Sequence, residues 1–263
     1  MTVAIPAVAA LLAACAAAMP TAAARAAEPT NIAAASDLTF ALTEAADLFA
    51  EETGLTVRLS FGSSGNFRRQ IAQGAPFDLF LSADENYVAD LFRAGLTLDE
   101  GAPYAIGRIV LFAPHGSTLR PDPELKDLVA AAADGRLKAF AIANPAHAPY
   151  GRAARQALTK AGLWDTIGAR LVLGENATQT AQFATSGSAQ GGIIPLSLAT
   201  VAAVSARGTF ALLPETWHEP LRQRMVLLRD ADEVARRFYA FLQDDAARSI
   251  LRRHGFALPD GAS

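Results

Sequence analysis

Hydrophobic positions along the chain follow two periods, one typical of strands and one typical of helices. Residues 56–61 alternate between polar and apolar side chains, which predicts a half-buried strand. Residues 38–49 place apolar side chains three and four positions apart, which predicts a helix that ends at Gly54. Further strands are expected at 31–35, 77–81, 108–114, 138–143, 171–173 and 191–194, and further helices at 84–94, 128–133, 151–158, 178–185, 196–204 and 231–253.

Strands that alternate with helices predict parallel sheets that are covered by helices. The order of elements and a length of 263 residues favour two such α/β lobes, each with a mostly parallel sheet. The first lobe is assigned residues 27–108 and 226–263, and the second lobe residues 109–225, with the return between lobes placed near 213–226. Ligands bind at the carboxyl ends of the strands in open parallel sheets. A ligand is therefore expected in the cleft between the two lobes.

Residues 1–26 predict a secretory signal peptide that is not part of the fold. Residues 5–19 form an almost unbroken apolar run, and residues 24–26 are a small-x-small cleavage pattern. Residues 12–15 also resemble a bacterial lipoprotein box, in which Cys15 would carry the lipid. The sequence thus predicts export to the periplasm, with lipid anchoring through Cys15 as the alternative.

Composition and charge exclude several other classes of protein. Cys15 is the only cysteine, so a chain cleaved after residue 26 has no disulfide and depends on its hydrophobic core for stability. The formal net charge of −3 and the lack of a basic run argue against nucleic acid and against a membrane surface as partners. The four histidines, at 115, 147, 218 and 254, lack the spacing of a metal site. We therefore expect no cofactor.

Four predicted strand-to-helix junctions carry neutral hydrogen-bond donors. They are Ser36-Asp37, Ser64-Gly65-Asn66, Tyr150-Gly151 and Asn176-Ala177-Thr178. A helix start has unpaired N–H groups and a partial positive charge, so it attracts anions, and a serine adds a hydroxyl donor. Each junction alone is compatible with an ordinary helix cap. Four of them, without the lysine of a phosphate-binding loop, favour a site for a small, fully ionised anion.

Several motifs stand in order along the chain: AAAS at 33–36, FGSSGN at 61–66, GAPFDLFLSAD at 74–84, ANPAHAPYG at 143–151 and GEN at 174–176. Together they resemble the periplasmic molybdate-binding proteins of ABC uptake systems, over nearly the whole chain after the leader. The resemblance implies a two-lobed type II periplasmic binding-protein fold that closes on molybdate or tungstate. It also implies a membrane ABC permease as partner, a monomer, and no enzymatic activity.

The resemblance assigns roles to four residues of this chain. Ser36 and Ser64 match serines that bind the oxyanion, and Tyr150 and Ala177 match positions whose backbone N–H groups face it. These residues would hold molybdate through its oxygen atoms only, with no bond from a side chain to molybdenum.

Two positions depart from the family's pattern. Pro195 stands where one branch of the family has a tyrosine, and proline offers neither a hydroxyl nor an N–H. The hydroxyl of Tyr150 is expected to replace the missing donor, as in another branch. Asp37 follows Ser36, and a carboxylate that points at a dianion would repel it. The Asp37 side chain is therefore expected to cap the helix and to face away from the site.

Two other functions fit parts of the pattern. A binding protein for sulfate or another tetrahedral oxyanion would need the same kind of donors. A serine hydrolase would use Ser63 or Ser64 as the nucleophile and His147 as the base, but residues 62–65 lack the G-x-S-x-G spacing of a nucleophile elbow. A binding protein for molybdate and tungstate is therefore the leading interpretation.

Overall fold

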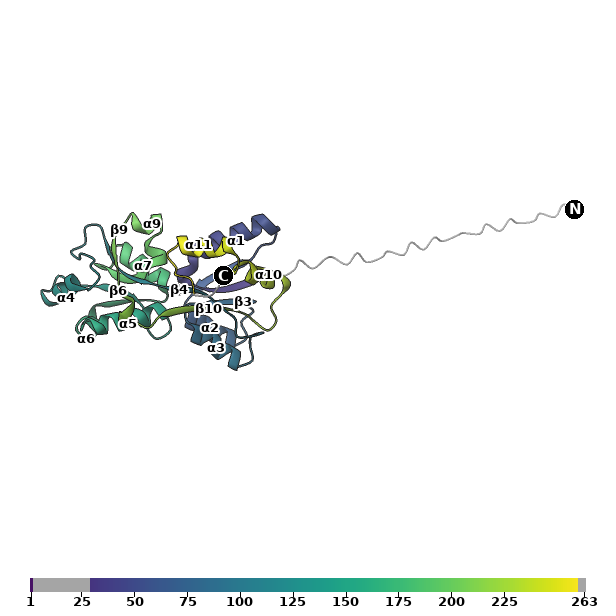
Figure 1. Cartoon of the computed structure of the whole chain (residues 1–263), viewed down its shortest axis with the longest axis horizontal. Helices are drawn as coiled ribbons and strands as arrows, with labels where there is room; N and C mark the ends of the chain where they lie inside the picture. The colour runs from purple at the N-terminus through teal and green to yellow at the C-terminus, as the bar shows by residue number, and fades with distance from the viewer. Residues whose placement is uncertain (2–28, 260–263) are drawn as a thin grey trace.

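The computed structural model of the chain describes residue 1 and residues 29–259, which fold into two lobes lying side by side (Figure 1). Residues 2–26 of the expected signal peptide, including Cys15, lie outside the described residues. Among the helices that are described, none is long and apolar enough to cross a membrane.

The first lobe is built on a five-stranded sheet with the order β2-β1-β3-β10-β4. Its strands are β1 (Asn31–Ala35), β2 (Arg58–Gly62), β3 (Leu79–Ser82), β4 (Ala102–Gly107) and β10 (Leu221–Leu227). β1 pairs in parallel with β2 and β3, and β10 pairs antiparallel with β3 and β4. Four of the five strands therefore run in one direction, and β10 is the reversed strand.

The second lobe repeats this arrangement with the order β7-β6-β8-β5-β9. Its strands are β5 (Ile109–Pro114), β6 (Phe140–Ala143), β7 (Leu171–Gly174), β8 (Gly192–Pro195) and β9 (Gly208–Leu212). β6 pairs in parallel with β7 and β8, and β5 pairs antiparallel with β8 and β9. Both sheets are thus mixed, with four strands in one direction and one reversed, and the predicted two-lobed α/β fold class is confirmed.

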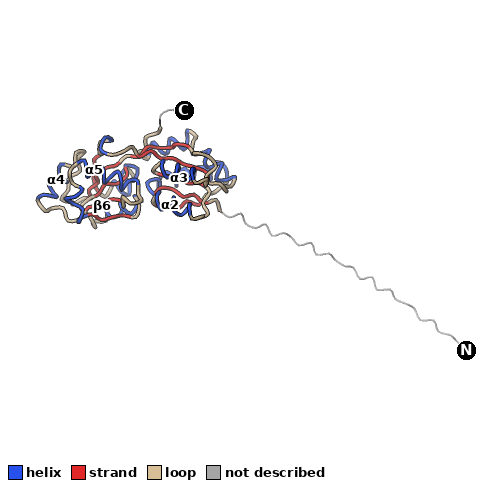
Figure 2. Tube along the Cα trace, turned by 90° about the horizontal axis from the view of Figure 1, so that it is seen from below, coloured by secondary structure: helices blue, strands red, loops and turns tan. Residues whose placement is uncertain are grey.

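Helices cover the sheets of both lobes, as the tube view also shows (Figure 2). The first lobe carries η1 (Ser36–Leu38), α1 (Thr39–Thr53), α2 (Ser64–Ala72), α3 (Glu85–Arg93), α10 (Glu233–Phe241) and α11 (Asp245–Arg253). The second lobe carries α4 (Lys126–Ala133), α5 (Pro149–Lys160), α6 (Trp164–Ile167), η2 (Gly168–Arg170), α7 (Ala177–Thr185), α8 (Leu196–Ala199), α9 (Ala202–Ser205) and η3 (Glu215–Trp217). The single helices expected at 196–204 and 231–253 are each two helices, because a turn separates α8 from α9 and another separates α10 from α11.

Buried side chains on both faces of the first sheet explain why its strands are so apolar. Ala33 and Ala34 of β1 are fully buried but belong to hydrophobic clusters on opposite faces. On one face Phe49 of α1 packs against Phe238 and Phe241 of α10, with ring centroids 5.1 and 5.4 Å apart. A sheet that is covered on both sides has no polar face, so the strand-to-helix junctions are where polar groups gather.

The chain crosses between the lobes twice. The first crossing lies between β4 and β5, at Arg108. The return differs from the expected boundary between residues 225 and 226, because β10 pairs within the first sheet from Leu221 onward. Gln223 of β10 is fully buried, and it is hydrogen-bonded beneath the cleft.

Candidate functional site

The four junctions predicted from the sequence meet around one small cavity between the lobes. η1 follows β1, α2 follows β2, α5 follows β6, and α7 follows β7. The cavity is lined by Ala35, Ser36, Asp37, Gly62, Ser63, Ser64, Ala83, Ala148, Pro149, Tyr150 and Ala177. Only about 10 Å³ of its space is open to the centre of a water molecule. The cavity is therefore small.

Two buried serines present their hydroxyls at this cavity. Ser36 Oγ accepts a hydrogen bond from the backbone N–H of Thr178 at 3.3 Å, and Ser64 Oγ accepts one from the N–H of Ala83 at 3.0 Å. Among the described residues, neither hydroxyl donates its own proton to an acceptor, and neither caps its helix. An O–H whose lone pair is engaged by an N–H is oriented to donate elsewhere. Both serines thus offer a donor to an anion in the cavity.

Two helix starts supply backbone donors to the same cavity. α5 begins with Pro149, which lacks an N–H, so Tyr150 provides the first amide of that helix. α7 begins at Ala177 after Asn176, whose side chain caps the helix by accepting from Gln179 N. Within residues 29–259, the N–H groups of Tyr150 and Ala177 have no hydrogen-bond acceptor. These N–H groups and the partial positive charge of the helix starts favour an anion.

Asp37 lines the cavity, and the expectation that it would cap the helix and face away is wrong. Its Oδ2 atom accepts hydrogen bonds from the Tyr150 hydroxyl at 2.9 Å and from Gln223 Nε2 at 2.7 Å. No side chain caps η1. Burial raises the pKa of Asp37 to about 6, and the hydrogen bonds from Gln223 and Tyr150, together with the nearby backbone N–H dipoles of Asp37 and Leu38, limit the rise. The carboxyl faces inward because two buried donors from β10 and α5 hold it there.

The Tyr150 hydroxyl does not take the role expected for it. Its proton is donated to Asp37 rather than directed at the cavity, because a carboxylate is a stronger acceptor than a neutral group. Pro195 ends β8 and pairs with Ile109, as a strand residue without a donor can do. Two residues further on, the Ser197 hydroxyl donates to the backbone oxygen of Asp37 at 2.9 Å. Tyr150 therefore offers the cavity its backbone N–H alone.

Hydrogen bonds join the two lobes on both sides of the cavity. On one side Ser63 Oγ contacts His147 Nδ1 at 2.8 Å, and Gly65 N donates to the His147 carbonyl at 3.0 Å. On the other side Thr178 Oγ1 donates to the backbone oxygen of Ser36 at 2.9 Å. The lobes are thus closed on each other, and a solute enters or leaves the cavity only when they separate.

Comparison with known proteins identifies the family of this chain. Residues 30–257 match the family described as bacterial extracellular solute-binding protein. The chain belongs to that family. The molybdate-binding protein ModA of Rhodobacter capsulatus is 34% identical over 227 residues, which covers 85% of this chain and 86% of the relative. ModA of Escherichia coli K12 is 30% identical over 238 residues, covering 87% and 88% of the two chains.

A solved structure agrees with the sequence relatives. The periplasmic molybdate-binding protein of Azotobacter vinelandii superposes with a TM-score of 0.80 at 32% identity, covering 88% of this chain and 100% of the other. Members of the family bind a solute and do not transform it, so this chain is a binding protein and not an enzyme.

The residues of the rejected hydrolase alternative do lie together, but they serve lobe contact. Ser63 Oγ lies 2.7 Å from the backbone oxygen of His147 as well as 2.8 Å from its ring. His147 Nε2 lies 3.5 Å from Glu175, whose side chain is largely exposed. A serine proton shared with a backbone carbonyl across a closed interface is suited to joining lobes rather than to nucleophilic attack.

Two residues at or near the cleft were missed by sequence reasoning. Gln223 holds Asp37, and Arg152 of α5 contacts Asp84 and Tyr87 of the first lobe. Thr178, which belongs to a predicted junction, bridges the lobes through its hydroxyl. For Gln223 a signal exists in the alternation of β10. It stands between Leu221 and Met225 on the buried side of the strand, where a polar residue needs a buried partner.

Proposed function

We propose that this protein captures molybdate, and tungstate in the same way, in the periplasm and delivers it to an ABC transporter in the membrane. The observation that carries the proposal is the convergence of neutral donors from four helix starts on one closed cavity. Relatives at 30–34% identity over most of the chain are named molybdate-binding proteins, which supports the choice of anion.

The donors suit an anion that is fully ionised at neutral pH. Ser36 and Ser64 offer hydroxyls, and Tyr150 and Ala177 offer N–H groups, so each donates and needs no proton from the ligand. Molybdate and tungstate are tetrahedral dianions of nearly equal size, and four donors from separate directions match a tetrahedron of oxygens. The metal atom itself would have no protein ligand. The transition from open to closed lobes would signal to the permease that the site is loaded.

Calorimetric titration of the purified protein with four anions tests this function. We expect tight binding of molybdate and tungstate, weaker binding of sulfate, and little binding of phosphate. Sulfate has shorter bonds, so it would leave donors of one lobe out of reach, and each unmade bond would cost about 1–3 kcal/mol. Phosphate keeps a proton at neutral pH and would need an acceptor. Equal affinity for sulfate and molybdate would replace the proposal with a general oxyanion-binding protein.

A further inference from the structure

A buried acid lines the cavity in which we place a dianion. Apart from Tyr150, Asp37 is the only ionisable side chain that lines the cavity, and it is 2% exposed. Its Oδ2 atom accepts two hydrogen bonds, whereas its Oδ1 atom is buried without a partner among the described residues. An ionised carboxylate with an unpaired oxygen opposes a neighbouring dianion, but a protonated carboxyl is a neutral donor.

No cation in the surroundings neutralises this acid. η1 packs against α1, α7, α8 and β2, and neither α7 nor α8 has an ionisable side chain. The titratable groups that act on Asp37 are the phenols of Tyr104 in β4 and Tyr150 in α5. Burial raises the pKa of both phenols well above their ordinary range, and the charge of Asp37 raises it further, so both stay neutral.

The charged residues on the elements around η1 are exposed or paired elsewhere. They are Glu44, Asp47, Glu51 and Glu52 of α1, Arg58 of β2, Arg152, Arg155 and Lys160 of α5, and Arg222 and Arg224 of β10. The repulsion between Asp37 and a bound dianion must therefore be relieved at Asp37 itself.

Resting on the proposed function, we propose that Asp37 takes up one proton from solvent when molybdate binds. The reaction joins the ionised protein, the dianion and one proton into a complex whose carboxyl is neutral. Oδ2 keeps its bonds from Tyr150 and Gln223, and the new O–H on Oδ1 has no competing acceptor among the described residues. Asp37 then adds a donor to the site, in place of the donor that Pro195 cannot provide.

The direction of the pH dependence follows from linkage. In the closed lobes without a ligand, burial raises the pKa of Asp37 to about 6, so the carboxyl is mostly ionised at pH 7 to 8. Opening the lobes hydrates the carboxyl and favours the ionised form further. A dianion in the cavity raises that pKa further. Affinity is then greatest below the free pKa and falls about tenfold per pH unit above it, until the pH reaches the pKa of the complex. Molybdate itself is fully ionised over this range and contributes no proton.

Calorimetry in buffers with different ionisation enthalpies measures the number of protons taken up on binding. At pH 7.5 we expect about one proton for the wild type and none for Asp37→Asn, because the amide has the shape of the protonated acid. From pH 6.5 to 8, molybdate affinity should fall about tenfold or more in the wild type and stay level in Asp37→Asn. As a matched control, Asp78→Asn alters a carboxyl whose pKa is also raised by burial but which lies away from the cavity. It should leave proton uptake unchanged.

The outcomes separate this inference from the proposed function. Tight molybdate binding by the wild type without proton uptake would overturn the inference and leave the function intact, and this readout does not depend on how any variant folds. Loss of binding in a folded Asp37→Asn would overturn it as well, because the ionised carboxylate would then be required. Phosphate binding that vanishes in Asp37→Asn would assign Asp37 the opposite role, as an acceptor for a ligand proton. No molybdate binding by the wild type at any pH would overturn the proposed function itself.

Discussion

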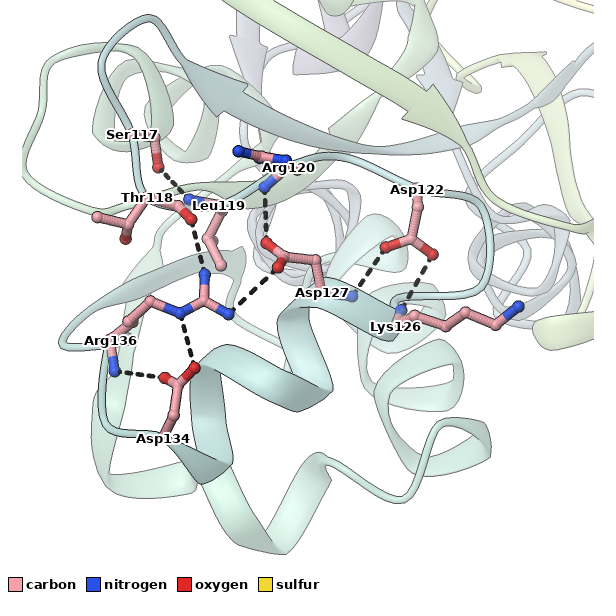
Figure 3. A network of polar contacts seen from close by, with 9 residues as sticks. All are labelled: Ser117, Thr118, Leu119, Arg120, Asp122, Lys126, Asp127, Asp134 and Arg136. Atoms are coloured by element: carbon pink, nitrogen blue, oxygen red, sulfur yellow. Dashed lines mark hydrogen bonds and ion pairs between the residues drawn. The ribbon is translucent and has the colours of Figure 1, made fainter.

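The polar groups around the cavity differ in one respect from the polar network at the far end of the second lobe (Figure 3). In that network Arg136 donates to Asp134 at 2.7 Å, to Asp127 at 3.2 Å and to the backbone oxygen of Thr118 at 2.8 Å. Asp127 also accepts from the backbone N–H of Arg120 at 2.8 Å. The carboxylates of Asp122, Asp127 and Asp134 and the guanidinium of Arg136 all have partners there, whereas the cavity contains donors and one carboxyl oxygen without partners among the described residues.

The two regions show how a structural cluster and a binding site can share the same residue types. Hydrogen bonds from Arg136 hold the pKa of Asp134 below its ordinary value, since the ionised form is the paired form. Burial moves the pKa of Asp37 in the other direction. An exposed cluster whose charged groups are hydrogen-bonded to one another stabilises its own loop. A buried cluster with donors and an acceptor that have no partner can still form hydrogen bonds with a ligand.

The largest effect is expected from a substitution that keeps the cavity but prevents closure. A Cβ atom at Gly65 would lie 2.5 Å from the backbone oxygen of His147 and 2.8 Å from the Tyr87 hydroxyl. Gly65→Ala should therefore disfavour the closed form by about 1–3 kcal/mol, which weakens molybdate binding roughly 5- to 150-fold. The free energy of unfolding of the ligand-free protein should hardly fall, because alanine suits a helix start and open lobes avoid the clash with His147. Tyr87 lies in the same lobe as Gly65, but its hydroxyl is the far end of a side chain that can move aside.

A matched glycine provides the control for closure. A Cβ atom at Gly168 in η2 would meet no atom within 4 Å, and its backbone is in the right-handed helical region. Gly168→Ala should leave molybdate affinity unchanged. Wild-type affinity in Gly65→Ala would show that the lobes need not approach as closely as this structure has them.

The fold and the positions of the junctions follow from the sequence, because they depend on local periodicity and on the direction of neighbouring strands. Parallel strands bring their carboxyl ends to one edge, so serines 28 positions apart, Ser36 and Ser64, reach one cavity. The orientation of Asp37 does not follow from sequence, because it depends on Gln223, which is 186 positions away. The return between the lobes lies between β9 and β10, within the expected stretch 213–226, but the exact boundary depends on the pairing of β10 with β3 and β4, which the sequence does not show.

The second-largest effect is expected when serines at the cavity are replaced by alanine, in contrast to a serine of the distal network. Ser36→Ala removes a hydroxyl donor to a charged acceptor, worth about 1.5–3 kcal/mol, so molybdate affinity should fall roughly ten- to a hundred-fold. Ser64→Ala should do the same, with an added loss of stability because the buried N–H of Ala83 loses its acceptor. Ser117 in the distal network accepts from Leu119 N and donates to the backbone oxygen of Gln190. Ser117→Ala should lower the unfolding free energy by about 1 kcal/mol without changing affinity.

Titration and thermal unfolding of these three variants decide whether the contrast holds. A loss of melting temperature in Ser36→Ala with unaltered molybdate affinity would make Ser36 a structural residue like Ser117. A loss of affinity in Ser117→Ala would instead show that the distal network communicates with the cavity.

A smaller effect is expected at the rim of the cleft. Arg152 of α5 bonds to Asp84 and donates to the Tyr87 hydroxyl at 2.7 Å, so it joins the lobes without touching the cavity. Arg152 and Asp84 are both partly exposed, so the pair is worth at most about 1 kcal/mol. Arg152→Met should weaken molybdate binding a few-fold, mainly through faster release measured by stopped flow. Arg155→Met, on the same helix, removes only a contact with Trp164 inside the second lobe and should leave release unchanged.

The smallest effect is expected for Arg136→Met in the distal network. Molybdate affinity should be that of the wild type, because nothing in Figure 3 reaches the cavity. The melting temperature should fall slightly at neutral pH and low salt, and the difference should shrink as salt screens these exposed pairs. Since Arg136 depresses the pKa of Asp134, its stabilisation is present above the ordinary carboxyl pKa of about 4. It is lost as the pH falls through the lowered pKa, where the acid is neutral in both states. Melting curves of the two proteins should therefore converge in acid; a gap that persists there would mean that Arg136 acts through packing and not through its charge.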